Sequence, residues 1–164
     1  MPENKINFID LAAVYKLRQS EFDTAIAATL ASADYINGKA LAEFNLAISS
    51  YTGVEHVITC GNGTDALQIA MMALNLTEGD EIILPAFTYT ATAEVIALLK
   101  LKPVFVEVCA DTFNIDVAAV EAAITAKTKA LLPVHLFGQC ANMEAIMALA
   151  NKHNLYIIED AAQA

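Results

Sequence analysis

The sequence has 164 residues, of which 57% are apolar and 17% charged, and its formal net charge at pH 7 is −10. So apolar a composition excludes intrinsic disorder, and the excess of acidic residues argues against a surface that binds nucleic acid. No apolar stretch approaches the roughly 18 residues of a membrane-spanning helix, and residues 1–10 lack a secretory signal. We therefore expect a cytoplasmic protein without a membrane or nucleic-acid partner.

Residues 1–53 predict helices and no strands. Apolar residues recur at helical spacing in two stretches, separated by a turn at Asn37-Gly38 and closed by Gly53. The apolar residues concerned are Phe22, Ile26, Leu30, Leu41, Phe44 and Ile48. We expect residues 1–53 to form an N-terminal helical segment and residues 54–164 to form an α/β domain.

Five short apolar runs follow, with little alternation between apolar and polar residues, and they are typical of strands buried on both faces of a parallel sheet. They are His56–Cys60, Glu81–Pro85, Pro103–Val108, Ala130–Val134 and Leu155–Glu159. Helical patterns separate them. One helix should begin after Asp116. Another helix, which lies before Pro103 in the sequence, should be stopped by that proline. This order predicts an α/β fold with βαβ crossovers.

The loop before the first α/β helix has the composition of an anion site. It reads Cys60-Gly61-Asn62-Gly63-Thr64-Asp65-Ala66-Leu67. Its glycines would let a ligand approach the backbone, and free N–H groups at a helix start would bind a phosphate. The alternative is a tight turn capped by Thr64. The loop also matches G-x-G-x-x-A, but the acid that a nicotinamide dinucleotide site needs after the second strand is missing, so that site remains a minor alternative.

Three further residues lie beyond the expected carboxyl ends of strands, where α/β sheets bind ligands. Tyr89 could stack on a flat cofactor ring or belong to a packed loop. Asp160 would need a cationic or hydrogen-bonded partner, such as a protonated ring nitrogen, or would cap a following helix. His135 is either a ligand contact or, as we favour, a core histidine with satisfied hydrogen bonds.

The cysteines Cys60, Cys109 and Cys140 lack the spacing of a disulfide framework or a zinc site. We expect them to be buried, reduced thiols, and we expect no metal site. No Ser/His/Asp or Cys/His combination for nucleophilic catalysis can be assigned.

Ordered motifs from about residue 8 to the last residue are similar to those of one enzyme family. They include Gly63-Thr64-Asp65-Ala66-Leu67, Pro85-Ala86-Phe87-Thr88-Tyr89, Pro133-Val134-His135 and Ile158-Glu159-Asp160-Ala161-Ala162-Gln163. The chain resembles the DegT/DnrJ/EryC1/StrS family of sugar-nucleotide aminotransferases. The resemblance implies the N-terminal part of the large domain of a fold-type I transferase that uses pyridoxal 5'-phosphate (PLP). Such a domain has a mostly parallel sheet flanked by helices, here preceded by a helical lead-in.

The resemblance also implies roles for the cofactor-binding residues. Asp160 would hold the pyridinium nitrogen of PLP, and Gln163 would hydrogen-bond its ring hydroxyl. Tyr89 would stack on the ring. The phosphate would be held by Thr64 together with the backbone of Gly63 and Asp65.

In the family, the lysine that forms a Schiff base with PLP lies a few tens of residues beyond the motif at 159–163, and this sequence ends at Ala164. We therefore expect a truncated chain that has no catalytic residue of its own and no transaminase activity alone. The whole enzyme would be a homodimer that moves an amino group from glutamate to a keto-sugar nucleotide in amino-sugar or surface-polysaccharide synthesis. The motifs look most like those of members that act on UDP-2-acetamido-2-deoxy-3-oxo-glucuronate. A non-catalytic PLP-binding or assembly fragment is the alternative.

Overall fold

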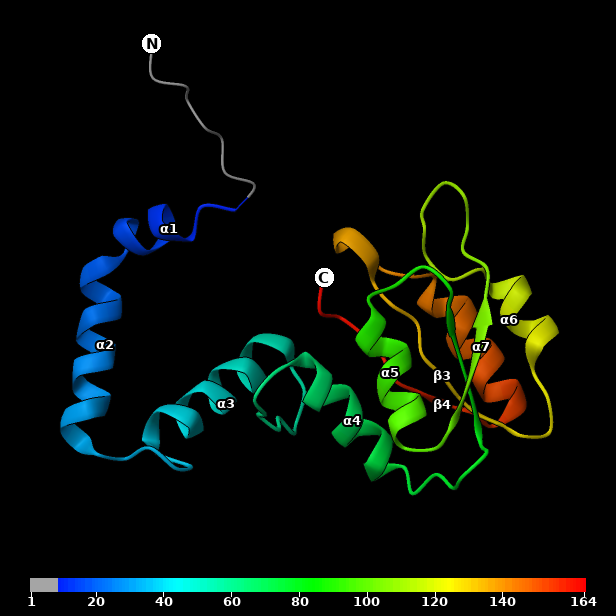
Figure 1. Cartoon of the computed structure of the whole chain (residues 1–164), viewed down its shortest axis with the longest axis horizontal. Coiled ribbons are helices and arrows are strands. Elements are labelled where there is room, and N and C mark those ends of the chain that lie inside the picture. The colour runs from blue at the N-terminus through cyan, green and yellow to red at the C-terminus, as the bar shows by residue number, and fades with distance from the viewer. Residues whose placement is uncertain (1–8) are drawn as a thin grey trace, which may run out of the picture. The chain divides into compact units, whose positions relative to one another are not determined.

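The computed structural model describes residues 9–164, which form two compact units divided between Thr59 and Cys60 (Figure 1). The first unit contains the helices α1 (Leu11–Leu17), α2 (Gln19–Ser32) and α3 (Lys39–Thr52). Helices thus precede the second unit, as the expected helical lead-in requires. Helix α3 ends at Gly53, whose φ of 75° is the left-handed conformation that glycine adopts without strain. None of the residues in these three helices is buried.

The second unit is a four-stranded parallel sheet with the strand order β2-β1-β3-β4. Its elements, in chain order, are α4 (Gly63–Ala73), β1 (Glu81–Pro85), α5 (Thr90–Leu98), β2 (Lys102–Val106), α6 (Val117–Ala123), β3 (Thr128–Leu131), the short 3-10 helix η1 (Leu136–Gly138), α7 (Met143–His153) and β4 (Tyr156–Ile157). This arrangement confirms the predicted α/β fold.

Strand β1 is the centre of the unit, because all five of its residues are buried. Alternate side chains of β1 point to opposite faces of the sheet. Ile82 and Leu84 pack with residues of α4 and α5, whereas Ile83 packs with residues of α6 and α7. Helices therefore cover both faces of the sheet (Figure 1). The absence of apolar–polar alternation in this part of the sequence reflects that double coverage.

The prediction of a strand at His56–Cys60 is wrong, because these residues have no regular secondary structure. Their β-branched composition suits a strand, but a strand exists only through pairing, and no pairing with this segment occurs within residues 9–164. Ile58, which should lie in the sheet, is 78% exposed. The remaining four strands are present: Glu81–Pro85 has the predicted ends, and the ends of the other three are shifted.

Pro103 does not stop a helix. Helix α5 ends at Leu98, and the chain reverses at Lys100, which has a φ of 58°. Pro103 is the second residue of β2, an edge strand, where the missing N–H of proline can be tolerated.

The cysteines are free, as predicted, but they are not buried: Cys60 and Cys140 are exposed, and Cys109 is half-buried. In the part of the chain that the structure describes, no cluster of His, Cys, Asp and Glu could hold a metal ion. No helix there is both long and apolar enough to cross a membrane.

A buried carboxylate closes the amino end of the sheet. Glu81 accepts hydrogen bonds from Lys102 Nζ at 2.8 Å and from Thr125 Oγ1 at 2.5 Å. These bonds, that of Lys102 above all, hold the pKa of Glu81 below its usual value. They connect the first residues of β1 and β2 to the turn before β3.

We expect Glu81→Gln to lower the free energy of unfolding at pH 7 by about 1–2 kcal/mol, because it removes a charge-assisted hydrogen bond. A lowered folded-state pKa stabilises the protein above the unfolded-state pKa of about 4.3, and this stabilisation is lost as the pH falls through the folded-state value. The difference between the two proteins should therefore shrink below pH 4.

Urea unfolding followed by circular dichroism at pH 7 and pH 3 measures both effects. Glu78→Gln is the control, since the Glu78 side chain is 77% exposed and lies 4.0 Å from Lys100. A pH-independent difference for Glu81→Gln would contradict the role of the charge.

Candidate functional site

A cavity of about 410 Å³ lies in the second unit, at the edge where the strands have their carboxyl ends. Five of the six predicted cofactor-binding residues line it: Gly63, Thr64, Tyr89, Asp160 and Gln163. They come from the start of α4, the start of α5 and the segment after β4. The sixth, Asp65, is not among the lining residues.

Asp160 is a buried residue of the cavity wall whose backbone is fixed by the sheet. Its N–H donates to Pro133 O at 2.9 Å, and its carbonyl accepts from His135 N–H at 3.0 Å. These bonds form a parallel bridge between Val134 and Asp160 that extends the pairing of β3 and β4. Asp160 is therefore held in the sheet and is only 8% exposed. Residues 161–164, which follow Asp160, form a turn.

The Asp160 carboxylate is hydrogen-bonded but makes no ion pair. Oδ2 accepts from Thr92 Oγ1 at 2.9 Å, and Oδ1 accepts from Ala162 N–H at 3.2 Å. Because Thr92 gives its proton to the carboxylate, the 3.1 Å contact between Thr88 and Thr92 must be donated by Thr88. None of the ion pairs found in residues 9–164 includes Asp160. A buried negative charge in this state favours a cationic ligand group.

The start of α4 offers hydrogen-bond donors on another side of the cavity. Gly63 and Thr64 occupy the first two helical positions, whose N–H groups have no partner within a helix. A Cβ atom at Gly63 would meet no atom within 4 Å, so open space adjoins the backbone there. The arrangement is suited to an anion.

Thr64 is not the helix cap. Asn62 is the N-cap, and its Oδ1 accepts from Asp65 N–H at 2.9 Å while its Nδ2 donates to the Asp65 carboxylate at 3.0 Å. The Asp65 N–H is therefore already used, which argues against the predicted part of Asp65 in binding a phosphate. Asn62 was not predicted as the cap, although Asn is a preferred N-cap residue.

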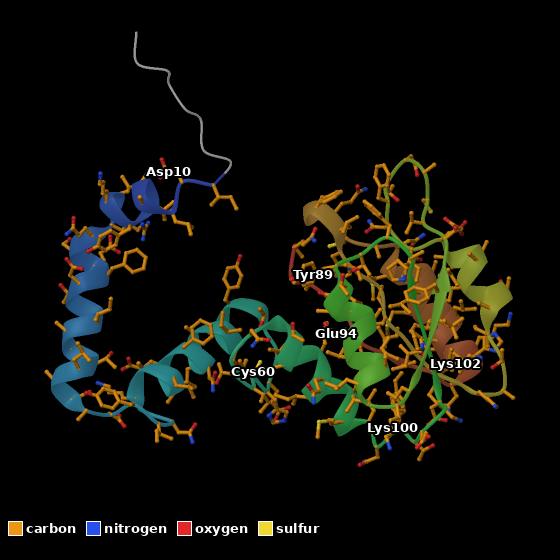
Figure 2. All side chains as sticks on the ribbon, in the orientation of Figure 1. Asp10, Cys60, Tyr89, Glu94, Lys100 and Lys102 are labelled. Carbon is orange, nitrogen blue, oxygen red and sulfur yellow. The ribbon has the colours of Figure 1, made fainter. Side chains whose placement is uncertain are left out.

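Tyr89 and Gln163 lie on the more open part of the wall. Tyr89 precedes the first residue of α5 and is 73% exposed, so its ring is accessible to a ligand (Figure 2). Gln163 is also exposed, and its Oε1 accepts from Phe137 N–H at 2.9 Å.

His135 is a buried residue with both ring nitrogens in hydrogen bonds. Nδ1 accepts from Ala141 N–H at 3.1 Å, and Nε2 lies 2.9 Å from a carboxylate oxygen of Glu159. A backbone N–H can only donate, so the ring proton resides on Nε2 and is donated to Glu159. The favoured interpretation of His135 as a satisfied core histidine is confirmed.

The threonines that support Asp160 were also missed. Thr88 lies before α5 and Thr92 lies in its first turn, and their hydroxyl oxygens are 3.1 Å apart. The pairing with Asp160 spans 68 positions in the sequence, so local patterns do not predict it.

We expect Asp160→Asn to stabilise the ligand-free protein by about 1 kcal/mol, because it removes a buried charge that has no counter-ion. The new amide NH₂ can donate to Thr92, whose hydroxyl can then donate to Thr88, so no hydrogen bond need be lost.

Urea unfolding at pH 7 measures this change. The control is Asp116→Asn, at the N-cap of α6. The Asp116 carboxylate accepts hydrogen bonds from two backbone N–H groups, so its replacement should not stabilise the protein. A loss of stability in Asp160→Asn would show that the carboxylate is compensated in the free protein.

Comparison with known proteins identifies the family of this chain. The sequence profile of the DegT/DnrJ/EryC1/StrS aminotransferase family matches residues 16–164. UDP-2-acetamido-2-deoxy-3-oxo-D-glucuronate aminotransferase of Pseudomonas aeruginosa is 47% identical over 158 residues, which are 96% of this chain and 44% of that protein.

Two solved structures are similar along almost the whole chain. A DegT DnrJ EryC1 StrS aminotransferase from Brucella abortus has a TM-score of 0.94 and 44% identity, with 98% of this chain and 45% of that chain covered. NtdA from Bacillus subtilis, with bound cofactor PMP, has a TM-score of 0.89 and 33% identity, with 100% and 39% covered. The chain thus spans less than half the length of these relatives. Because the family profile covers residues 16–164, the chain belongs to the DegT/DnrJ/EryC1/StrS aminotransferase family.

Proposed function

We propose that this chain provides the non-covalent PLP site of an aminotransferase that acts on a keto-sugar nucleotide. The main support is the buried Asp160 carboxylate, which has hydrogen bonds but no ion pair within the described residues. It lines the same cavity as the start of α4. The cavity volume of about 410 Å³ falls within the range of about 300–1,000 Å³ that is usual for small-molecule sites. Residues 54–164 would form the PLP-binding domain, and residues 1–53 the helical segment attached to it.

The residues around the cavity fit PLP in their chemistry. The N–H groups of Gly63 and Thr64, with the Thr64 hydroxyl, would bind the phosphate. Tyr89 would cover a face of the ring, and the Gln163 amide would bind the ring hydroxyl. When bound, PLP supplies an electron sink for amino-group transfer.

Asp160 would keep a proton on the ring nitrogen. Its carboxylate would attract the positive charge of that nitrogen at short range, and burial strengthens this attraction because little water screens it. The Thr88 and Thr92 hydroxyls would keep the carboxylate in place, since each donates in the same direction along the chain Thr88–Thr92–Asp160. No lysine is among the residues that line the cavity within residues 9–164.

The proposed substrates are glutamate and a UDP-linked 3-oxo sugar, which would be aminated at C3. This part of the proposal is supported by the similarity to the P. aeruginosa aminotransferase, whose name specifies a 3-oxo-D-glucuronate. A non-catalytic PLP-binding or assembly role is the second candidate. An amination assay with 3-oxo and 4-oxo nucleotide sugars, on a full-length form that includes the Schiff-base lysine, separates these possibilities. Amination at C4 would contradict the C3 proposal, and PLP binding by that form without any turnover would favour the second candidate.

We also propose that the protein acts as a homodimer in the cytoplasm. The support is the first unit, whose helices bury none of their residues and expose large apolar side chains such as Leu17, Leu46 and Tyr51. Exposed apolar surface of this kind is typical of contact regions. Light scattering coupled to size-exclusion chromatography would report the mass, and a stable monomer would contradict the proposal.

The PLP site can be tested by titration with PLP, followed by absorbance and calorimetry. We expect Asp160→Asn to raise the Kd for PLP about tenfold or more, because a charge-assisted contact is lost. Glu94→Gln is the matched control, since Glu94 is exposed on the same helix as Thr92 and does not line the cavity (Figure 2). Equal effects of the two substitutions, or no PLP binding by the unsubstituted protein, would overturn the proposal.

A further inference from the structure

Asn114 is a buried polar side chain that belongs to no part of the cavity wall, yet it holds a loop next to that wall. It lies between β2 and α6 and is 5% exposed. Its Oδ1 accepts from Leu136 N–H at 3.2 Å, and its Nδ2 donates to Gln139 O and Cys140 O, both at 3.1 Å. One amide group thus joins both ends of the segment 136–140.

The segment held in this way contains a strained residue. Phe137 has a φ of 55°, a left-handed conformation that is uncommon for a bulky side chain, and Gly138 follows with a φ of 84°. A conformation of this kind persists only when the surrounding structure imposes it. The three hydrogen bonds of Asn114 impose it from both ends of the segment.

Phe137 in turn determines how the Gln163 amide is oriented. The Phe137 N–H donates at 2.9 Å to the Gln163 side chain. Because a backbone N–H can only donate, the acceptor must be the amide oxygen, and the group left for a ligand is the NH₂. Gln163 therefore meets a ligand in the cavity as a hydrogen-bond donor.

We propose that Asn114 is a positioning residue for cofactor binding: it fixes segment 136–140 so that Phe137 N–H holds the Gln163 amide with its NH₂ available to an acceptor oxygen on the ring. The identity of the ring rests on the proposed PLP function. The positioning itself concerns contacts of this chain alone.

An aromatic contact links the same loops a second time. The rings of Phe113 and Phe137 both pack against Phe87, with centroid distances of 5.7 and 6.3 Å. Phe113, which directly precedes Asn114, also has a left-handed φ of 58°. These contacts should keep the unit folded when the amide is altered. Substitutions at Asn114 should therefore loosen segment 136–140 without unfolding the unit.

The first test measures hydrogen exchange of the Phe137 amide by NMR in the protein without ligand. Asn114→Asp keeps the acceptor for Leu136 N–H and loses both donated bonds. We expect it, and Gln163→Ala, to speed Phe137 exchange about tenfold. Gln163→Glu keeps an acceptor oxygen and should preserve the protection.

The control variant is Asn142→Ala, which removes a side-chain bond to Ala145 N–H at the start of α7, outside the cavity. It should leave Phe137 exchange within twofold of the unsubstituted protein. Circular dichroism checks that each variant is folded, and Asn114→Ser replaces Asn114→Asp if the latter is not. Unchanged Phe137 exchange in the folded Asn114 variant would overturn the proposal.

The second test is a double-mutant cycle on the Kd for PLP. We expect Asn114→Asp and Gln163→Ala each to raise the Kd about tenfold, and the double variant to bind no more weakly than Gln163→Ala, because Asn114 acts through Gln163. Independent effects would multiply to about a hundredfold and would overturn the proposal. If the unsubstituted protein binds no PLP, the proposed function fails, whereas the exchange experiment still decides whether Asn114 positions Gln163.

Discussion

The site depends on the short parallel bridge between Val134 and Asp160. A carboxylate at the wall of a cavity can stay buried only if its backbone cannot swing toward water, and the two backbone hydrogen bonds of Asp160 to Pro133 and His135 prevent that movement. The bridge continues the pairing of β3 and β4, so the sheet that supplies the core also sets the place of the charge. The chain of Thr88 and Thr92 hydroxyls then fixes the direction of the carboxylate oxygens.

A second constraint is that two loops and the start of α4 must meet at the same edge. The parallel order of β2, β1, β3 and β4 brings all the carboxyl ends of the strands to that edge. The loop with Tyr89 follows β1, and the segment with Asp160 and Gln163 follows β4. Residues more than 70 positions apart therefore line one cavity without any strain in the strands themselves.

Much of this could be predicted from the sequence because the signals are local. Buried parallel strands are recognisable as apolar runs, helix ends as Gly53 and Asp116, and loop chemistry as glycines and hydroxyls. The strand prediction for His56–Cys60 was wrong because β propensity does not show whether a pairing partner exists. The Thr92–Asp160 contact and the hydrogen bonds of Asn114 could not be predicted from the sequence. Each joins residues that are distant in sequence, and each side chain has several possible partners. The predicted cofactor roles remain predictions.

The two ends of strand β1 have different roles, one in stability and one in the cavity. The Glu81–Lys102–Thr125 contacts lie at its first residue, and the loop that leads to Tyr89 begins after its last residue, Pro85. Four steps of a strand place these ends roughly 13 Å apart. Substitutions more than about 10 Å apart that share no partner usually have independent effects. Substitutions that stabilise the amino end, for example to raise thermal tolerance, should therefore leave the geometry of the cavity unchanged.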